Sequence, residues 1–248
     1  MKNNILNKIK LIKNKFLDIL YPKHIKCIFC GDELKVLNKF DCCENCFKNL
    51  NIINNNCSRC GNPMPENIKG VCLNCKKNNY HFNYAQSVFS YKDNVAKIIQ
   101  NLKYNSAKYL ADPLGEFLYK KLIELNWKID LITFVPLHTK RIKKRGYNQA
   151  EILADQLSRK SGIEIKNILE RDKNTPSQTS LKVKERAKNM ENAFKLTDNN
   201  IKDLNVLIID DVFTTGATVN EIAKVLKNAK AKNVYVLTLA HTVFKSDY

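Results

Sequence analysis

The sequence predicts an α/β fold in which a parallel sheet carries helices on both faces and follows a small cysteine-rich module. Two observations carry this prediction. All nine cysteines lie between Cys27 and Cys75. From Asp93 onward, short apolar strands alternate with amphipathic helices, which is the pattern of a parallel sheet covered by its crossover helices. The change in composition indicates a domain boundary near residue 80.

Seven stretches of the second part have a recognisable hydrophobic pattern. Apolar residues fall on one side of a helix at residues 95–102, 114–122, 147–157 and 219–226. Apolar runs typical of buried strands occupy residues 131–135, 206–209 and 233–240. Residues 171–192 are polar and have no clear period, so we expect a long mobile loop there.

Length and charge limit the class of protein. A chain of 248 residues with 44% hydrophobic residues has room for one ordinary domain and a small one. The formal net charge of +18 favours polyanionic partners such as nucleic acid, acidic lipid or a phosphorylated ligand. No stretch contains the roughly 18 apolar residues of a membrane span. We therefore expect a cytoplasmic protein whose thiols stay reduced.

The first residues predict an amphipathic helix rather than a signal peptide. Residues 5–20 place isoleucines and a phenylalanine on one face, and lysines interrupt the apolar pattern, unlike the continuous apolar core of a leader. We expect this helix to pack on the protein. Its lysine-rich face leaves peripheral contact with a membrane surface as the alternative.

Eight of the nine cysteines form Cys-x-x-Cys pairs. The pairs are Cys27/Cys30, Cys43/Cys46, Cys57/Cys60 and Cys72/Cys75. Two intervening residues let both sulfurs of a pair point at one ion, and tetrahedral Zn²⁺ takes two such pairs. In a reducing compartment this spacing indicates metal rather than disulfides. Four thiolates leave no open coordination position, so the predicted role of both Zn²⁺ ions is structural.

The order of the pairs contains an internal repeat. A pair followed by glycine, at residues 27–31 and again at 57–61, precedes a plain pair each time. This repeat favours two sequential zinc sites over two interleaved ones. Cys42 is left over, and it either replaces Cys43 as a ligand or is simply buried.

Residues 206–218 contain the most specific motif of the chain. An apolar strand ends in two adjacent carboxylates, Asp210 and Asp211, and a short loop rich in threonine and glycine then opens a helix. Glycine and alanine let backbone N–H groups approach a phosphate at the positive end of a helix dipole. Adjacent acids at the end of a strand can accept hydrogen bonds from two ribose hydroxyls and help to hold Mg²⁺ through water.

This motif resembles the signature of type I phosphoribosyltransferases, whose Rossmann-like domain binds 5-phosphoribosyl 1-pyrophosphate (PRPP). The resemblance implies PRPP with Mg²⁺ as ligand and makes Asp210 and Asp211 the candidate catalytic acids. The candidate phosphate-binding residues are Thr214, Thr215, Gly216, Ala217 and Thr218. The candidate pyrophosphate-binding residues follow the strand at 131–135 and are Pro136, Leu137, His138, Arg141 and Arg145. Arginine pairs bidentately with phosphate oxygens, and Lys103 is a weaker candidate.

Two further sets of residues narrow the resemblance. Residues 146–150, Gly-Tyr-Asn-Gln-Ala, follow the arginines. A later set comprises Arg171, Thr175, Gln178, Arg186, Asn189, Ala193 and Phe194. With the cysteine module in front, these resemble the ComF family. The resemblance runs from about residue 19 to the C-terminus and implies a double zinc ribbon followed by a phosphoribosyltransferase domain. With the helix predicted from the hydrophobic pattern, we expect an N-terminal helix at 1–22, a double zinc ribbon at 23–80 and a phosphoribosyltransferase-like domain at 81–248. The resemblance also implies a link to DNA uptake in natural transformation and to other DNA-uptake proteins.

Three functions stay open at this point. As an enzyme, the chain would release pyrophosphate from PRPP and join an acceptor to the ribose. Thr214 stands where purine-salvage members of this fold carry a further acid, which argues against 6-oxopurine acceptors. The second function is binding of single-stranded DNA, supported by the basic charge and by aromatic residues that we expect to be exposed, such as Tyr80, Phe82 and Tyr84. The third is a PRPP sensor without catalysis.

Overall fold

The computed structural model describes residues 25–104, 107–171 and 193–243. The helix predicted at residues 5–20 and, except for Arg171, the loop predicted at 171–192 lie outside the described residues. The chain forms two compact units, Met1–Asn49 and Leu50–Tyr248.

The described part of the first unit is a cysteine knuckle with little regular secondary structure. The backbone N–H of Gly31 donates to the carbonyl of Cys27 at 2.8 Å and closes the first turn. The other pair brackets the start of helix α2 (Glu44–Lys48), where Cys43 is the N-cap and its sulfur accepts from the N–H of Cys46. Because two tight turns supply the four sulfurs, this small unit needs few apolar residues of its own.

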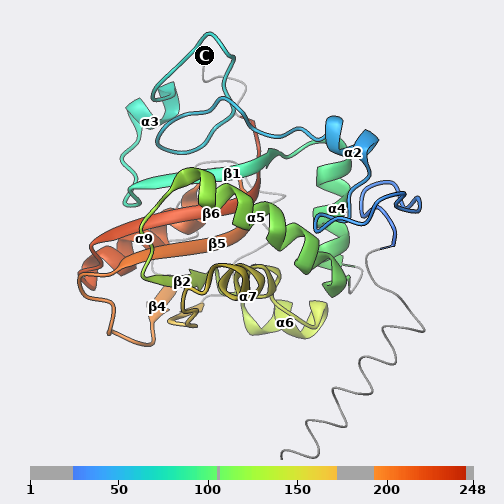
Figure 1. Cartoon of the computed structure of the whole chain (residues 1–248). Helices are drawn as coiled ribbons and strands as arrows, with labels where there is room; N and C mark the ends of the chain where they lie inside the picture. Colours follow the sequence, from blue (N-terminus) through green and yellow to red (C-terminus); the bar gives the residue numbers. More distant parts are fainter. Residues whose placement is uncertain (1–24, 105–106, 172–192, 244–248) are drawn as a thin grey trace, which may run out of the picture. The chain divides into compact units, whose positions relative to one another are not determined.

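The second unit is built on a four-stranded parallel sheet (Figure 1), which confirms the predicted fold class. In spatial order its strands are β1 (Tyr84–Ser90), β6 (Asn233–His241), β5 (Asn205–Phe213) and β2 (Leu131–Phe134). Residues 206–209 of β5 are fully buried, because a central strand covered on both faces is apolar throughout. A separate antiparallel pair joins β3 (Leu169–Arg171) and β4 (Phe194–Leu196).

Helices cover both faces of this sheet. The helices of this unit are α3 (Leu73–Lys77), which belongs to the second cysteine knuckle, α4 (Asp93–Tyr104), α5 (Ala111–Leu125), α6 (Thr139–Arg145), α7 (Gln149–Ser161) and α9 (Ala217–Asn228), with a 3-10 turn η1 (Lys108–Leu110) before α5. Helices α5 and α7 pack side by side on one face, and α9 lies on the other (Figure 1). The apolar stripes of α4, α5, α7 and α9 face inward, as their period predicts. Among the described helices, none combines the length and the apolar character that crossing a membrane requires.

The second cysteine knuckle lies against the sheet of the same unit. The N–H of Ala85 on β1 donates to the carbonyl of Arg59 at 2.7 Å, and that of Ile53 donates to Val88 at 2.9 Å. A Cβ on Gly61 would lie 2.9 Å from the Ala85 carbonyl oxygen, so only glycine lets the turn approach the strand this closely. The knuckle therefore covers the β1 edge, which would otherwise expose unpaired backbone groups.

Candidate functional site

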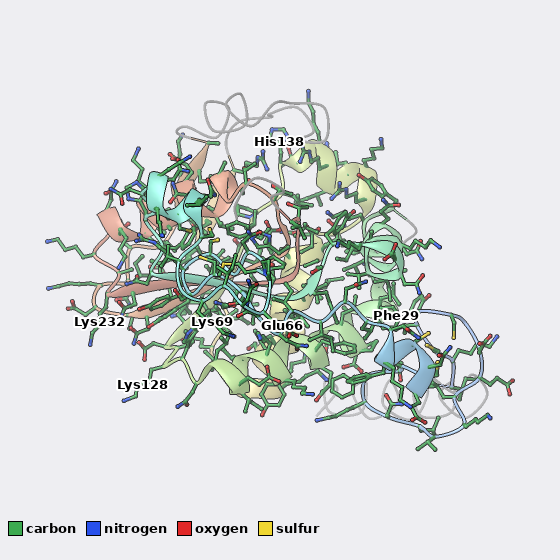
Figure 2. All side chains as sticks on the ribbon, turned by 90° about the horizontal axis from the view of Figure 1, so that it is seen from above. Phe29, Glu66, Lys69, Lys128, His138 and Lys232 are labelled. Atoms are coloured by element: carbon green, nitrogen blue, oxygen red, sulfur yellow. The ribbon has the colours of Figure 1, made fainter. Side chains whose placement is uncertain are left out.

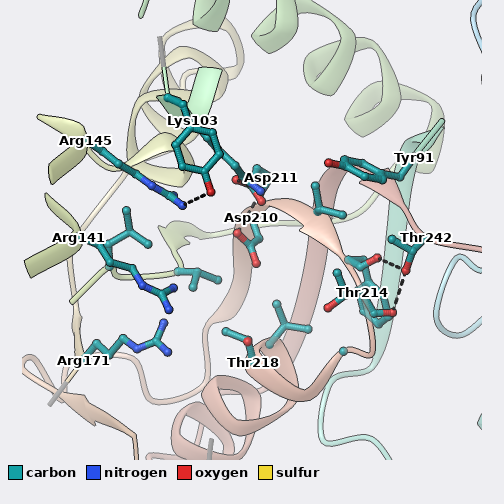
Figure 3. Close-up of a pocket in the computed structure, with 17 residues that line it drawn as sticks. Tyr91, Lys103, Arg141, Arg145, Arg171, Asp210, Asp211, Thr214, Thr218 and Thr242 are labelled. Carbon is teal, nitrogen blue, oxygen red and sulfur yellow. Dashed lines mark hydrogen bonds and ion pairs between the residues drawn. The ribbon is translucent and has the colours of Figure 1, made fainter. Parts of the chain in front are cut away.

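A cavity of about 400 Å³ opens at the carboxyl ends of the parallel strands (Figure 3). Every strand contributes a lining residue at or just beyond its end: Tyr91 after β1, Val135 after β2, Asp211 within β5 and Thr242 after β6. Open parallel sheets bind ligands at this edge. The topology thus brings together residues that are far apart in sequence.

The two adjacent acids lie at the centre of the cavity. Lys103 in the last turn of α4 places Nζ 2.9 Å from Oδ2 of Asp211. Burial and the neighbouring Asp211 carboxylate raise the pKa of Asp210 to about 7. Burial alone would lower the pKa of Lys103, but Asp211 outweighs it and raises that pKa. One carboxylate is therefore charge-paired, and the other loses its proton near neutral pH.

The loop after β5 is shaped for close approach of an anion. Gly216 has φ 76° and caps α9, and a Cβ there would lie 2.6 Å from Cζ of Phe213. Both the left-handed backbone and the contact with Phe213 require glycine. Thr218 follows in the first turn of α9 and lines the cavity. The first N–H groups of a helix have no intrahelical partner and attract anions.

Three arginines form the opposite wall. Arg141 and Arg145 come from α6 and Arg171 from the end of β3, and Figure 3 shows all three pointing into the cavity. Burial lowers the pKa of Arg171 to about 10, and the charge of Arg141 adds to this. The pKa of Arg141 is lowered by burial and by Arg145. A wall of mutually repelling guanidinium groups is suited to a polyanion that would neutralise it.

Three contacts orient Arg145. Arg145 donates to Oε1 of Gln149 at 2.8 Å and to the Tyr104 hydroxyl at 3.2 Å. Its guanidinium also lies 4.9 Å from the centre of the Tyr104 ring, within cation–π range.

The residues predicted to bind PRPP divide into two groups. Eight of the twelve line the cavity: Leu137, Arg141, Arg145, Asp210, Asp211, Thr214, Gly216 and Thr218. The other four, Pro136, His138, Thr215 and Ala217, are not among its lining residues. His138 instead caps α6, where Nδ1 accepts from the N–H of Lys140 at 3.2 Å, while Oγ1 of Thr215 accepts from the N–H of Ala217 at 3.4 Å.

Several lining residues were not identified as candidates from the sequence. Tyr91, Tyr104 and Thr242 line the cavity, yet each is a single residue without a surrounding motif. The hydroxyl of Thr242 lies 3.4 Å from the carbonyl oxygens of both Phe213 and Thr214 and can donate to either, and its backbone N–H donates to Phe213 at 3.0 Å. These contacts connect the end of β6 to the loop. Arg171 was noted only as a residue of the family pattern.

Two clusters of four cysteines are formed, and they confirm the sequential grouping. Cys27, Cys30, Cys43 and Cys46 form one, and Cys57, Cys60, Cys72 and Cys75 the other. Within each cluster the sulfurs lie within 4.8 Å of one another. Two sulfur pairs are 3.8 Å and 3.7 Å apart. A tetrahedron with Zn–S bonds of about 2.3 Å has edges of about 3.8 Å, so the donor sets fit Zn²⁺.

The ninth cysteine is not part of either cluster. Cys42 is 4% exposed, and burial raises its pKa to about 12. Its thiol donates to the carbonyl of Cys43 at 3.5 Å. Of the two roles considered for Cys42, burial is the one that the structure shows, and Cys43 provides the sulfur of the cluster.

Asp210→Asn is expected to stabilise the ligand-free protein at alkaline pH. A raised carboxyl pKa means that the folded chain holds a proton that the unfolded chain has lost, so this group lowers stability as pH rises from about 4 to about 7. In the wild-type chain the N–H of Asp211 donates to Oδ1 of Asp210 at 2.8 Å. The asparagine removes the stability penalty and keeps an oxygen that can accept this hydrogen bond. Thermal unfolding should show a higher midpoint than wild type at about pH 8 and a smaller difference at about pH 5. An equal difference at both pH values would contradict the assignment.

A parallel sheet that places paired acids, a helix-capping loop and arginines at its carboxyl edge defines a phosphoribosyltransferase-type domain. The sequence matches the phosphoribosyl transferase domain family over residues 108–247 and the double zinc ribbon domain family over residues 16–76. With both regions in one polypeptide, this chain belongs to the ComF family of competence proteins.

Three relatives illustrate the similarity. Competence protein F of Haemophilus influenzae is 32% identical over 226 residues, covering 88% of this chain and 97% of the relative. Competence protein ComFC of Streptococcus pneumoniae is 26% identical and covers 87% and 99%. The DNA utilization protein YhgH of Salmonella typhimurium is 29% identical over 193 residues and covers 75% and 84%.

Proposed function

We propose that this chain binds PRPP with Mg²⁺ at the carboxyl edge of its sheet and acts through that site in the uptake or use of DNA. The observation that carries the proposal is the arrangement of one cavity, with paired acids at its centre, a glycine-capped helix on one side and three arginines on the other. The names of the relatives, competence and DNA utilization proteins, supply the cellular context.

Each part of PRPP has a chemically suitable partner. The acids Asp210 and Asp211 would accept from the ribose hydroxyls. The loop and the first turn of α9 would hold the 5-phosphate. The guanidinium groups of Arg141 and Arg171 would hold the pyrophosphate. Mg²⁺ fits an adjacent carboxylate pair and would supply charge neutralisation for the phosphate oxygens.

Two modes of action are compatible with such a site. In phosphoribosyl transfer the bond between C1 and the pyrophosphate oxygen breaks, pyrophosphate leaves with the bonding electrons, and an acceptor atom bonds to C1. The arginines would stabilise the charge that develops on the leaving group. In sensing, the same contacts would bind PRPP without an acceptor. Thr214 lines the cavity at the position where purine-salvage members of this fold carry a further acid, which argues against a 6-oxopurine acceptor in the transfer mode.

Calorimetry of the full chain tests the proposal. Mg²⁺–PRPP should bind, and ribose 5-phosphate and pyrophosphate should each bind more weakly, because each fills only part of the cavity. A screen for pyrophosphate release across candidate acceptors then separates transfer from sensing. Absence of PRPP binding by a correctly folded, zinc-loaded chain would refute the proposed function.

We expect about two structural Zn²⁺ per chain, with unequal stability. All four sulfurs of the second cluster belong to buried residues, whereas Cys30 of the first is exposed. A chelator should therefore remove Zn²⁺ from the first cluster faster. Elemental analysis gives the content, and release to a chromogenic chelator gives the rates. Cys57→Ser should abolish only the slower phase and unfold the second knuckle, and a metal content near zero in reduced, chelator-free protein would contradict the expectation.

Binding of single-stranded DNA is the second candidate function. Phe82 is not exposed as expected, because its ring is buried at 1% exposure, whereas Tyr84 is 47% exposed. The ring of Tyr84 stacks on Tyr235 at 6.3 Å, which stacks on Trp127 at 4.8 Å. Two lysines with exposed side chains are close to these rings in sequence (Figure 2): Lys128 follows Trp127, and Lys232 lies three residues before Tyr235. Rings beside lysines form a surface for bases and phosphates, here at the amino end of β1, at the other end from the cavity.

Fluorescence anisotropy with a labelled oligonucleotide tests this surface. Tyr84→Ala should weaken binding, by about 1–3 kcal/mol for each base that stacks, and binding should fall steeply with salt. PRPP should compete little, because the cavity lies at the opposite edge of the sheet. Unchanged binding in Tyr84→Ala would exclude this surface. Together with DNA binding, we propose that the chain contacts other DNA-uptake proteins.

A further inference from the structure

We infer that the second zinc knuckle is part of the PRPP site, because Tyr80, held by that knuckle, positions the phosphate loop. The inference rests on the proposed function and assigns the knuckle a role beyond structural support. All residues involved belong to the unit Leu50–Tyr248.

A chain of polar contacts connects the knuckle to the loop. Asn74 lies between the cluster residues Cys72 and Cys75, in helix α3. Its Nδ2 donates to the hydroxyl of Tyr80 at 2.9 Å, and that hydroxyl donates to the carbonyl of Thr215 at 3.5 Å. The backbone of the proposed phosphate loop is therefore tethered to the residues between two zinc ligands.

A chain of aromatic contacts runs beside the polar one. Tyr80 stacks on Phe82 with ring centres 4.7 Å apart, and Phe82 meets Phe213 edge-on at 6.1 Å. Phe213 is the ring against which Gly216 packs. A displacement of Tyr80 would thus be passed to the residue that caps α9, since close-packed rings cannot move independently.

The knuckle also holds the first turn of α9. The backbone N–H of His81 donates to Oδ1 of Asn220 at 2.6 Å. Asn220 lies in the first turn of α9, and its own N–H donates to the carbonyl of Gly216 at 2.8 Å. Residues 80–82 therefore contact the loop at Thr215, the ring of Phe213 and helix α9 at Asn220.

These contacts predict that zinc and PRPP stabilise each other's sites. Without Zn²⁺ the second knuckle loses the four metal–sulfur bonds that would define it, so Tyr80 loses its support. By thermodynamic reciprocity, PRPP must raise the affinity of the second cluster for Zn²⁺ by the same factor by which Zn²⁺ raises the affinity for PRPP. The first knuckle provides an internal control, because its residues take no part in these contacts.

Two measurements on the unmodified full chain test the inference. Saturating Mg²⁺–PRPP should raise the affinity of the second cluster for Zn²⁺ at least about fivefold, measured in competition with a chelator. Release of this Zn²⁺ should be slower, while the faster release from the first cluster stays unchanged. Hydrogen exchange should show protection of peptides covering residues 72–82 and none in peptides covering residues 27–46. A wild-type chain that binds PRPP without either change overturns the inference and leaves the proposed function intact.

A variant pair adds a test of the tyrosine itself. Tyr80→Ala should retain two Zn²⁺ and bind PRPP about tenfold more weakly, and PRPP should no longer slow zinc release. Tyr84→Ala removes a neighbouring tyrosine that makes no contact of this kind and should behave as wild type toward PRPP. Equal PRPP affinity in both variants overturns the inference. Failure of the wild type to bind PRPP overturns the proposed function, and the inference with it.

Discussion

Replacing both acids, Asp210→Asn with Asp211→Asn, is expected to lower the affinity for Mg²⁺–PRPP at least about a hundredfold. Hydrogen bonds to a charged acceptor contribute about 1.5–3 kcal/mol each, and the pair is the only acidic group lining the described cavity. Asp210→Asn should not weaken the fold, because burial and mutual repulsion already disfavour the charge of Asp210. Asp211→Asn removes the carboxylate partner of Lys103 and should lower the unfolding midpoint without abolishing the fold. Calorimetry measures the affinity, and thermal unfolding verifies the fold.

A matched control separates the site from the overall charge. The double variant makes the chain more positive by two charges, which by itself would favour any polyanion. Asp198→Asn with Asp203→Asn makes the same change at exposed residues before β5, at the other end of that strand. Lost binding in the first variant and retained binding in the second would identify the acids as ribose-binding groups. Wild-type affinity in the first variant would refute the assignment.

Much of the fold can be predicted from the hydrophobic period of the sequence. The elements that this period does not predict have physical reasons for escaping it. Strands β2, β5 and β6 were predicted because they are buried on both faces and continuously apolar. Strand β1 was not, because it contains Gln86 and Ser87, although both are buried. Ser87 is accommodated by a 2.6 Å hydrogen bond between its hydroxyl and that of Thr238 on β6. A partner from a distant strand cannot be foreseen in a local pattern.

The site residues likewise divide into those that a local sequence pattern predicts and those that depend on contacts between distant segments. The acids and the loop were predictable because they lie in one short segment whose order reflects its chemistry. Tyr91 and Thr242 could not be found this way, since they reach the cavity only because β6 pairs with β5 and β1 pairs with β6. The cysteine grouping followed from a repeat in sequence, but the contact between Tyr80 and Thr215 depends on the fold of the whole unit.

Thr218→Glu is expected to separate DNA binding from DNA uptake. Residue 218 lies in the first turn of α9 and lines the cavity. A carboxylate there suits the helix dipole but repels an incoming phosphate by about 4 kcal/mol at 4 Å and an effective dielectric constant of about 20. This substitution is preferable to one at Gly216, where any side chain would collide with Phe213 and make loss of function ambiguous.

Asn200→Glu is the matched control, because it adds the same charge on an exposed turn before β5. Both variants should bind single-stranded DNA equally in vitro, with the same salt dependence. When each replaces the chromosomal gene in the host cell, Thr218→Glu should transform no better than a deletion strain, and Asn200→Glu should transform normally. The acids and the phosphate loop have no evident use in a protein that only binds DNA, since carboxylates repel phosphodiesters. If Thr218→Glu folds, fails to bind PRPP and still transforms at wild-type frequency, the PRPP site has no role in uptake, and DNA binding by the basic aromatic surface becomes the function to pursue.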